Sequence, residues 1–335
     1  MKKLFASLAV SLALISAPAI AETTLRLSSW AGPNHPINSQ VLSQWAEDVN
    51  QATDGRVSID ILYDIAPPPA QMETVADNIA DIGWIFHGFA PGRFVLTKVA
   101  EFPLENEFTA EQISVAYWRT HKEYFEGANE HRGLKVLGLG VHGPGQLMTT
   151  DLVTSFDDIQ RSKIRVGGGV ITDVAEKLGV NRVAMPTPEV YQAISQGVVN
   201  GTFLAVETLR SMNLADVSPY VYYMPGGMYG GTFSIFINSD VWANLSKEDR
   251  IAIESVSYEN LSQLFGQVMH NADTVGLEYG AENGVTVTRA SKDDIDKVYK
   301  ISNELKQSWV EEVSKKYSID GQAALDFFNK QLNSL

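Results

Sequence analysis

The stretch KIRVGGGVITDVAEKLG, from Lys163 to Gly179, places a short β-type run, three glycines and a helical pattern in succession. Ile164 and Val166 fit a strand, and apolar residues at helical spacing follow from Val170 onward. Arg165 lies between the two apolar strand residues, so its side chain is expected on the opposite face. A strand, a glycine turn and a helix in this order are typical of an α/β sheet.

The same stretch predicts an anion site. Gly167, Gly168 and Gly169 carry no side chain, so a ligand can approach their backbone. A helix N-terminus offers unpaired N–H groups, and the guanidinium of Arg165 matches a carboxylate in two parallel hydrogen bonds. The alternative is a structural salt bridge beside a loop. A nucleotide is disfavoured, because the glycines are consecutive and no Walker lysine follows them.

The rest of the chain alternates strand and helix patterns, which predicts an α/β fold. Ligands of open α/β sheets sit beyond the carboxyl ends of the strands, where we expect Trp30, Trp84 and Arg165. The expected strands cover residues 24–30, 56–63, 81–86, 135–141 and 232–238, and the expected helices include 37–53 and 111–125.

Two lobes are expected from the length of the chain. The loop HGPGQ, residues 142–146, leads out of the first lobe, and the strand at 232–238 returns to it. We therefore assign residues 22–145 and 234–275 to lobe I, and residues 146–233 and 276–335 to lobe II. The pattern from Ser246 to Gly284 predicts one helix of about forty residues, long enough to brace both lobes. The alternative is two helices broken around Gly276.

The first residues have the features of a secretory signal. Lys2 and Lys3 precede an apolar segment too short to span a bilayer, and the small-residue ending predicts cleavage after Ala21. We expect a monomeric periplasmic protein without membrane insertion. Removal of two lysines takes the formal charge from −14 to −16, which disfavours nucleic acid as a partner. The chain has no cysteine, so it forms no disulfide.

Four segments carry a resemblance to a known family: GRVSIDIL (55–62), IADIG (79–83), SFDDIQRSKIRV (155–166) and MPTPEVYQAISQGVVNG (185–201). Over essentially the whole mature chain the sequence resembles the DctP-like periplasmic solute-binding proteins of TRAP (tripartite ATP-independent periplasmic) transporters. The resemblance implies the two-lobed periplasmic binding protein fold, with a long bracing helix and a ligand cleft between the lobes. It also implies that Arg165 pairs with a ligand carboxylate, and that the receptor delivers an organic acid to TRAP membrane permease subunits.

The chain departs from the family pattern at two positions. Gln146 stands where many members carry a second arginine, and Leu204 stands at a common asparagine position. A glutamine cannot neutralise a second carboxylate, so we expect a monocarboxylate with an aromatic or onium body. A dicarboxylate or a sugar acid is the alternative. The candidate ligand-binding residues are Arg165, Gln146, Trp30, Trp84, His87, His142, Gly167, Gly168, Phe203 and Tyr229.

Core packing is the alternative for each of these aromatic residues, which could otherwise hold a ring or an onium head. The six histidines show no metal-binding spacing, and no nucleophile motif is present. We therefore expect no enzyme activity, no catalytic residue, no metal and no cofactor. An exported hydrolase is the alternative from another functional class, and presentation of the ligand to a sensor kinase is the alternative to a permease.

Overall fold

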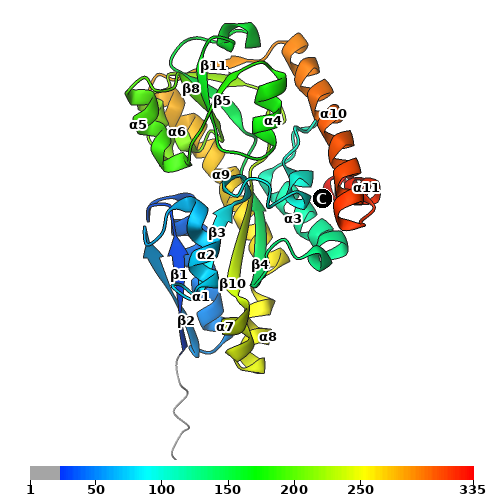
Figure 1. The fold of residues 1–335 in the computed structure, drawn as a ribbon. Coiled ribbons are helices and arrows are strands. Elements are labelled where there is room, and N and C mark those ends of the chain that lie inside the picture. Colours follow the sequence, from blue (N-terminus) through cyan, green and yellow to red (C-terminus); the bar gives the residue numbers. More distant parts are fainter. Residues whose placement is uncertain (1–22) are drawn as a thin grey trace, which may run out of the picture.

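The computed structural model describes residues 23–335, and the predicted signal lies outside this range. Two sheets form two lobes, one above the other in Figure 1. The sheet of the first lobe has the order β2-β1-β3-β10-β4. Strand β10 lies antiparallel to β3 and β4, so the chain returns to this sheet as expected. The strands are β1 (Thr23–Ser29), β2 (Val57–Tyr63), β3 (Ile82–Phe86), β4 (Leu134–Val141) and β10 (Thr232–Asn238).

The sheet of the second lobe has the order β11-β9-β5-β8-β6-β7. Arg165 lies on β6, which pairs in parallel with β7 and β8. At one edge of this sheet, β11 from the C-terminal part of the chain pairs in parallel with β9. The strands are β5 (Gln146–Thr149), β6 (Lys163–Val166), β7 (Asn181–Ala184), β8 (Gly201–Leu204), β9 (Tyr220–Tyr223) and β11 (Thr286–Arg289).

Helices cover both sheets (Figure 1). Among the described residues, no helix is long and apolar enough to cross a membrane. The helices are α1 (Ser43–Ala52), α2 (Gln71–Ala76), α3 (Ala110–Thr120), α4 (Val170–Lys177), α5 (Val190–Ser195), α6 (Thr208–Ser211), α7 (Ser239–Asn244), α8 (Lys247–Ser255), α9 (Glu259–Glu282), α10 (Lys292–Tyr317) and α11 (Gly321–Leu332).

The expected helix of about forty residues is broken, but not at Gly276. Helix α8 ends at Ser255 and α9 begins at Glu259, with Tyr258 between them at φ 61°. The N–H of Tyr258 donates to the carbonyl of Leu137 at 2.5 Å, and its ring stacks on Trp118 at 5.2 Å. These tertiary contacts override the local helical pattern.

Helix α9 still braces both lobes, as expected. It packs on α3 and β4 of the first lobe and on α6 of the second. Gly276 lies inside this helix, where an added Cβ would come within 2.4 Å of the carbonyl oxygen of Val206. The glycine therefore allows α9 to approach the second lobe closely.

The two C-terminal helices lie along one side of the molecule and touch both lobes (Figure 1). Helix α10 packs on α4 of the second lobe, and α11 packs on α3 of the first. The indole N–H of Trp309 on α10 also donates to the carbonyl of Val95 in the first lobe, at 2.7 Å. The C-terminal segment is thus a second connection between the lobes.

Candidate functional site

A cavity lies between the two lobes and contains Arg165. Its empty volume is about 480 Å³ when space open to solvent is included. Both lobes contribute to the wall, and most of the side chains are apolar or aromatic. The lining residues are Trp30, His35, Ile37, Phe86, His142, Phe233 and Met269 from the first lobe and its helix α9, and Arg165, Thr187, Leu204, Ala205, Glu207, Thr208, Met212 and Tyr229 from the second lobe and the segment that leads back from it.

Arg165 is the fixed cation of this cavity, and it is only 1% exposed. Its Nε donates to the carbonyl of Met185 at 2.9 Å, and its Nη2 donates to the hydroxyl of Thr187 at 3.1 Å. Its Nη1 lies 3.4 Å from the carbonyl of Phe203. Burial lowers the pKa of Arg165 to about 10, which still leaves it protonated at neutral pH.

The acceptors around this guanidinium are all neutral. Within residues 23–335, no carboxylate lies within ion-pair distance of Arg165. A buried charge without a counterion costs several kcal/mol, and an anionic ligand in the cavity would offset that cost. The arrangement is therefore suited to binding a carboxylate.

Three further candidates from the sequence, Trp30, His142 and Tyr229, line the same cavity. Trp30 stacks on Trp84 with ring centroids 4.3 Å apart. Trp84 itself is fully buried and donates to the hydroxyl of Ser29 at 2.9 Å. It lies behind Trp30 and supports that ring from outside the cavity wall.

Gln146 and Phe203 do not line the cavity. The side chain of Gln146 donates to the carbonyl of Met224 at 3.1 Å and accepts from its N–H at 2.7 Å, so both ends of the amide are engaged. The Phe203 ring lies in the core, while its carbonyl accepts from Arg165 and, at 3.3 Å, from the Tyr229 hydroxyl. Both residues hold neighbouring parts of the wall in place.

The sequence predicts that the N-terminus of α4 binds an anionic ligand. In the structure it binds a carboxylate of the protein itself. Glu101 of the first lobe accepts the N–H of Val170 at 2.9 Å. Its other oxygen accepts from the hydroxyl of Thr232 at 2.6 Å. Glu101 is buried, and its pKa is raised by burial, with the hydrogen bond from Thr232 as the largest opposing effect. The helix terminus is therefore a contact between the lobes.

The glycines of the loop before α4 leave room for close contacts. Gly168 has φ 103°, and an added Cβ would lie 2.0 Å from the carbonyl oxygen of Gly88 in the first lobe. Gly167 leaves room for the guanidinium, since a Cβ there would come within 2.9 Å of Nη2 of Arg165. Gly167, Gly168 and His87 line a separate hollow of about 1050 Å³ that does not contain Arg165.

His87 is buried in the first lobe rather than placed on the cavity wall. Its ring nitrogens lie 2.9 Å from the hydroxyl of Thr232 and 3.0 Å from that of Ser234. Burial lowers the pKa of His87 to about 3, so the ring is neutral at pH 7. The residue links the centre of the first sheet to the Glu101 contact.

Two polar residues of the cavity, His35 and Glu207, were missed in the sequence. His35 follows the first strand in the loop 32–36, so the strand-end rule that selected Trp30 could have found it. Glu207 has no distinctive signal among 40 acidic residues. Both are buried, and burial raises the pKa of Glu207 to about 7.

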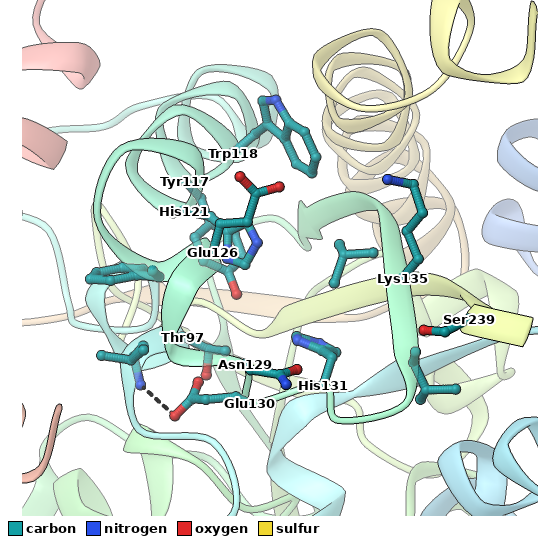
Figure 2. A pocket seen from close by; sticks show the side chains of 14 residues that line it. Thr97, Tyr117, Trp118, His121, Glu126, Asn129, Glu130, His131, Lys135 and Ser239 are labelled. Atoms are coloured by element: carbon teal, nitrogen blue, oxygen red, sulfur yellow. Dashed lines mark hydrogen bonds between the residues drawn. The ribbon is translucent and has the colours of Figure 1, made fainter. Parts of the chain in front are cut away.

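A larger hollow, of about 810 Å³, lies within the first lobe and shares no lining residue with the Arg165 cavity. Figure 2 shows Tyr117, Trp118 and His121 facing Glu130 and His131 across it. Its cation, Lys135, lies 3.6 Å from Glu254 and is already partnered. The buried guanidinium therefore favours the cavity between the lobes as the candidate ligand site.

Comparison with known proteins agrees with the fold. Residues 27–313 match the family model described as bacterial extracellular solute-binding protein, family 7. The chain is 30% identical over 312 residues to the outer membrane transporter protein TsaT of Comamonas testosteroni, covering 92% of this chain and 91% of that one.

Solved structures include two with aromatic acids. A TRAP periplasmic solute-binding protein of Bordetella bronchiseptica, with bound (R)- and (S)-mandelate, has a TM-score of 0.90 and 35% identity, and covers 93% of this chain and 99% of its own. A TRAP solute-binding protein of Rhodoferax ferrireducens with benzoate has a TM-score of 0.86 and covers 93% and 98%. At 22% identity, the latter likeness concerns the fold alone.

Proposed function

Because the chain belongs to the DctP family of bacterial extracellular solute-binding proteins (family 7), whose members are binding and transport receptors rather than enzymes, we propose that it binds a small organic carboxylate and delivers it to a TRAP membrane permease. The proposal rests on Arg165, a buried guanidinium with neutral acceptors only, in a cavity between two lobes. A ligand carboxylate in this cavity would supply the missing counterion and accept bidentate hydrogen bonds.

The favoured ligand is a monocarboxylate with an aromatic body. Arg165 is the one arginine or lysine among the described residues that line the cavity, and Glu207 adds an acid to the same wall. A second ligand carboxylate would be buried without a cation and near this acid, which is unfavourable. Trp30, Phe86 and Phe233 offer ring faces and edges to an aromatic ligand. The mandelate bound by the Bordetella relative is an acid of this kind.

Ligand binding is proposed to close the two lobes in the periplasm. The proposed closing units are the two lobes, each built around one sheet, and the cavity draws its wall from both. Closure of two lobes around a ligand is the usual behaviour of periplasmic receptors. The contact of Glu101 with Val170 and the bracing helix α9 would guide this movement.

A thermal-shift screen of organic acids tests the proposed function. A ligand that binds only the folded protein raises the melting temperature by mass action. Benzoate, mandelate, phenylacetate, succinate, glycine betaine and gluconate represent the competing ligand classes. We expect a shift with at least one aromatic monocarboxylate that exceeds the shift with succinate or gluconate. A screen in which succinate gives the largest shift would overturn the monocarboxylate assignment.

A further inference from the structure

The wall of the Arg165 cavity holds polar atoms that no contact within the protein explains. The indole Nε1–H of Trp30 is buried and has no acceptor among the described residues. A buried donor without an acceptor costs about 1–3 kcal/mol, so such groups are rare in native structures. In a ligand cavity, an unpaired donor indicates an acceptor on the ligand.

His35 presents a second donor from the same lobe. Its Nδ1 accepts the N–H of Ile37 at 3.2 Å, which leaves the ring proton on Nε2. Burial lowers the pKa of His35 to about 4, so the ring is neutral at pH 7. Nε2 lies 3.9 Å from Oε1 of Glu207, which is too far for a hydrogen bond between them.

Glu207 faces His35 from the second lobe and is 4% exposed. Its Oε2 accepts from the hydroxyl of Ser211 at 2.5 Å, and its backbone N–H donates to Asp273 on α9 at 3.0 Å. These contacts fix the residue, while Oε1 has no hydrogen bond within the described chain. The carboxyl group therefore keeps one oxygen for a further partner.

A hydroxyl oxygen fits the space between His35 and Glu207. An oxygen about 2.8 Å from Nε2 and about 2.8 Å from Oε1 spans the 3.9 Å gap at ordinary hydrogen-bond lengths. The hydroxyl accepts from the histidine and donates to the carboxyl group, and its second lone pair is free for another donor.

Other ligand groups match the hydrogen-bonding groups of the cavity wall less well. An ammonium group can donate to Glu207, but it has no lone pair for the N–H groups of His35 and Trp30. An unsubstituted ring leaves all three groups without a partner, and a second carboxylate faces Glu207 directly. The hydroxyl is thus the group that meets both the donor of His35 and the acceptor of Glu207.

We propose, resting on the proposed function, that the ligand is a hydroxylated aromatic carboxylate whose carboxylate binds Arg165 and whose hydroxyl lies between His35 and Glu207. His35 and Glu207 come from different lobes, so the hydroxyl joins the lobes when the cavity closes around it. His35 and Glu207 thereby select hydroxy acids over the parent acids that lack the hydroxyl. A water molecule in the same gap would give no such selection.

Calorimetry with matched ligand pairs tests this assignment. The pairs are mandelate against phenylacetate, and 3- and 4-hydroxybenzoate against benzoate, with phenylglycine as the ammonium analogue of mandelate. For the wild-type protein, at least one hydroxy acid binds tighter than its parent by about tenfold or more, because the parent leaves buried polar groups unpaired. In Glu207→Leu and in His35→Phe this ratio falls to about twofold or less, while the parent acid, which still binds Arg165, keeps its affinity within about threefold.

Binding of the parent acid in each pair shows that a variant is folded and that Arg165 still binds a carboxylate. A variant that fails to fold is recognised by the loss of this binding, and the result then rests on the other variant. Glu130→Gln changes a partly buried acid that lines the 810 Å³ hollow of the first lobe, so it is the matched control and keeps the wild-type ratio. Equal affinities within every pair, or tightest binding of phenylglycine, would overturn the hydroxyl assignment and leave the proposed function intact. If no acid of either pair binds at millimolar concentration, the proposed function fails as well.

Discussion

The carboxylate of Glu101 accepts the N–H of Val170 at 2.9 Å and so joins the first lobe to the N-terminus of α4 in the second. A carboxylate at this end of a helix is stabilised by the unpaired N–H groups and the helix dipole. The contact lies in the same strand-loop-helix unit as Arg165. One loop therefore carries the junction of the lobes and lies beside the proposed ligand cation.

Glu101→Gln is expected to lower the free energy of unfolding by about 1–3 kcal/mol and to weaken binding of an aromatic acid several-fold. The amide keeps the shape but presents an N–H₂ group to either Val170 or Thr232, both of which donate to Glu101. Urea denaturation and calorimetry measure the two effects.

Asp173→Asn is the control for Glu101 at the same junction. Asp173 lies 3.3 Å from Lys98 of the first lobe, but its side chain is 41% exposed. Exposed pairs contribute about 0–1 kcal/mol, so little change is expected. Equal losses in both variants would contradict a special role for the buried contact.

Gly168→Ala is expected to prevent full closure of the lobes. Its φ of 103° disfavours a side chain, and the added Cβ would lie 2.0 Å from the carbonyl oxygen of Gly88. Affinity for the ligand should fall about tenfold or more, since the closed state carries the complete site. Gly179→Ala, at φ 76° with open space around it, controls for backbone strain alone and should retain wild-type affinity.

Solution scattering tests the closing movement itself. With saturating aromatic acid, the radius of gyration of the wild-type protein should decrease, because the lobes approach each other around the ligand. Gly168→Ala should show a smaller decrease at saturation. Identical scattering curves of the wild-type protein with and without ligand would contradict closure.

Stability should fall as the pH drops from 7 to 5. Burial lowers the pKa of His35, His87 and His142 to about 4, 3 and 4 from an ordinary value of 6.5. Between pH 6.5 and about 4 the unfolded chain therefore binds protons that the native histidines do not, and each can cost up to about 2 kcal/mol by pH 5.

Glu207 acts in the opposite direction. Its pKa is raised from 4.5 to about 7, so its contribution to stability is present below pH 4.5 and is lost as the pH rises through 7. Melting temperatures measured at pH 7 and pH 5 should thus show a larger drop for Glu207→Gln than for the wild-type protein. An equal or smaller drop in the variant would contradict the raised pKa.

Much of the fold followed from the sequence, because strands and helices alternate at clear periods. The resemblance to TRAP receptors is confirmed by the family match over residues 27–313. The exception is the helix expected from Ser246 to Gly284. Its break depends on contacts of Tyr258 with Leu137 and Trp118, which are remote in sequence. A local sequence pattern does not predict contacts between residues that are remote in sequence.

The site was less predictable, because the sequence shows which residues end strands but not which partners they meet. The strand-end rule selected Arg165 and Trp30, and both line the cavity between the lobes. Glu101 could not be found this way, since its role depends on the opposite lobe reaching the N-terminus of α4. Gln146 was expected at the ligand, but its amide is engaged by the backbone of Met224 across the sheet.

The central claim is that Arg165 holds the ligand carboxylate, and Arg165→Lys tests it most directly. Lysine keeps the positive charge but loses the planar fork, while Met185, Thr187 and Phe203 still offer acceptors to a buried cation. Calorimetry with the tightest-binding acid of the screen should give an affinity about tenfold or more below that of the wild-type protein, with a melting temperature that shows the variant to be folded. Equal affinity of the folded variant and the wild-type protein would contradict the account.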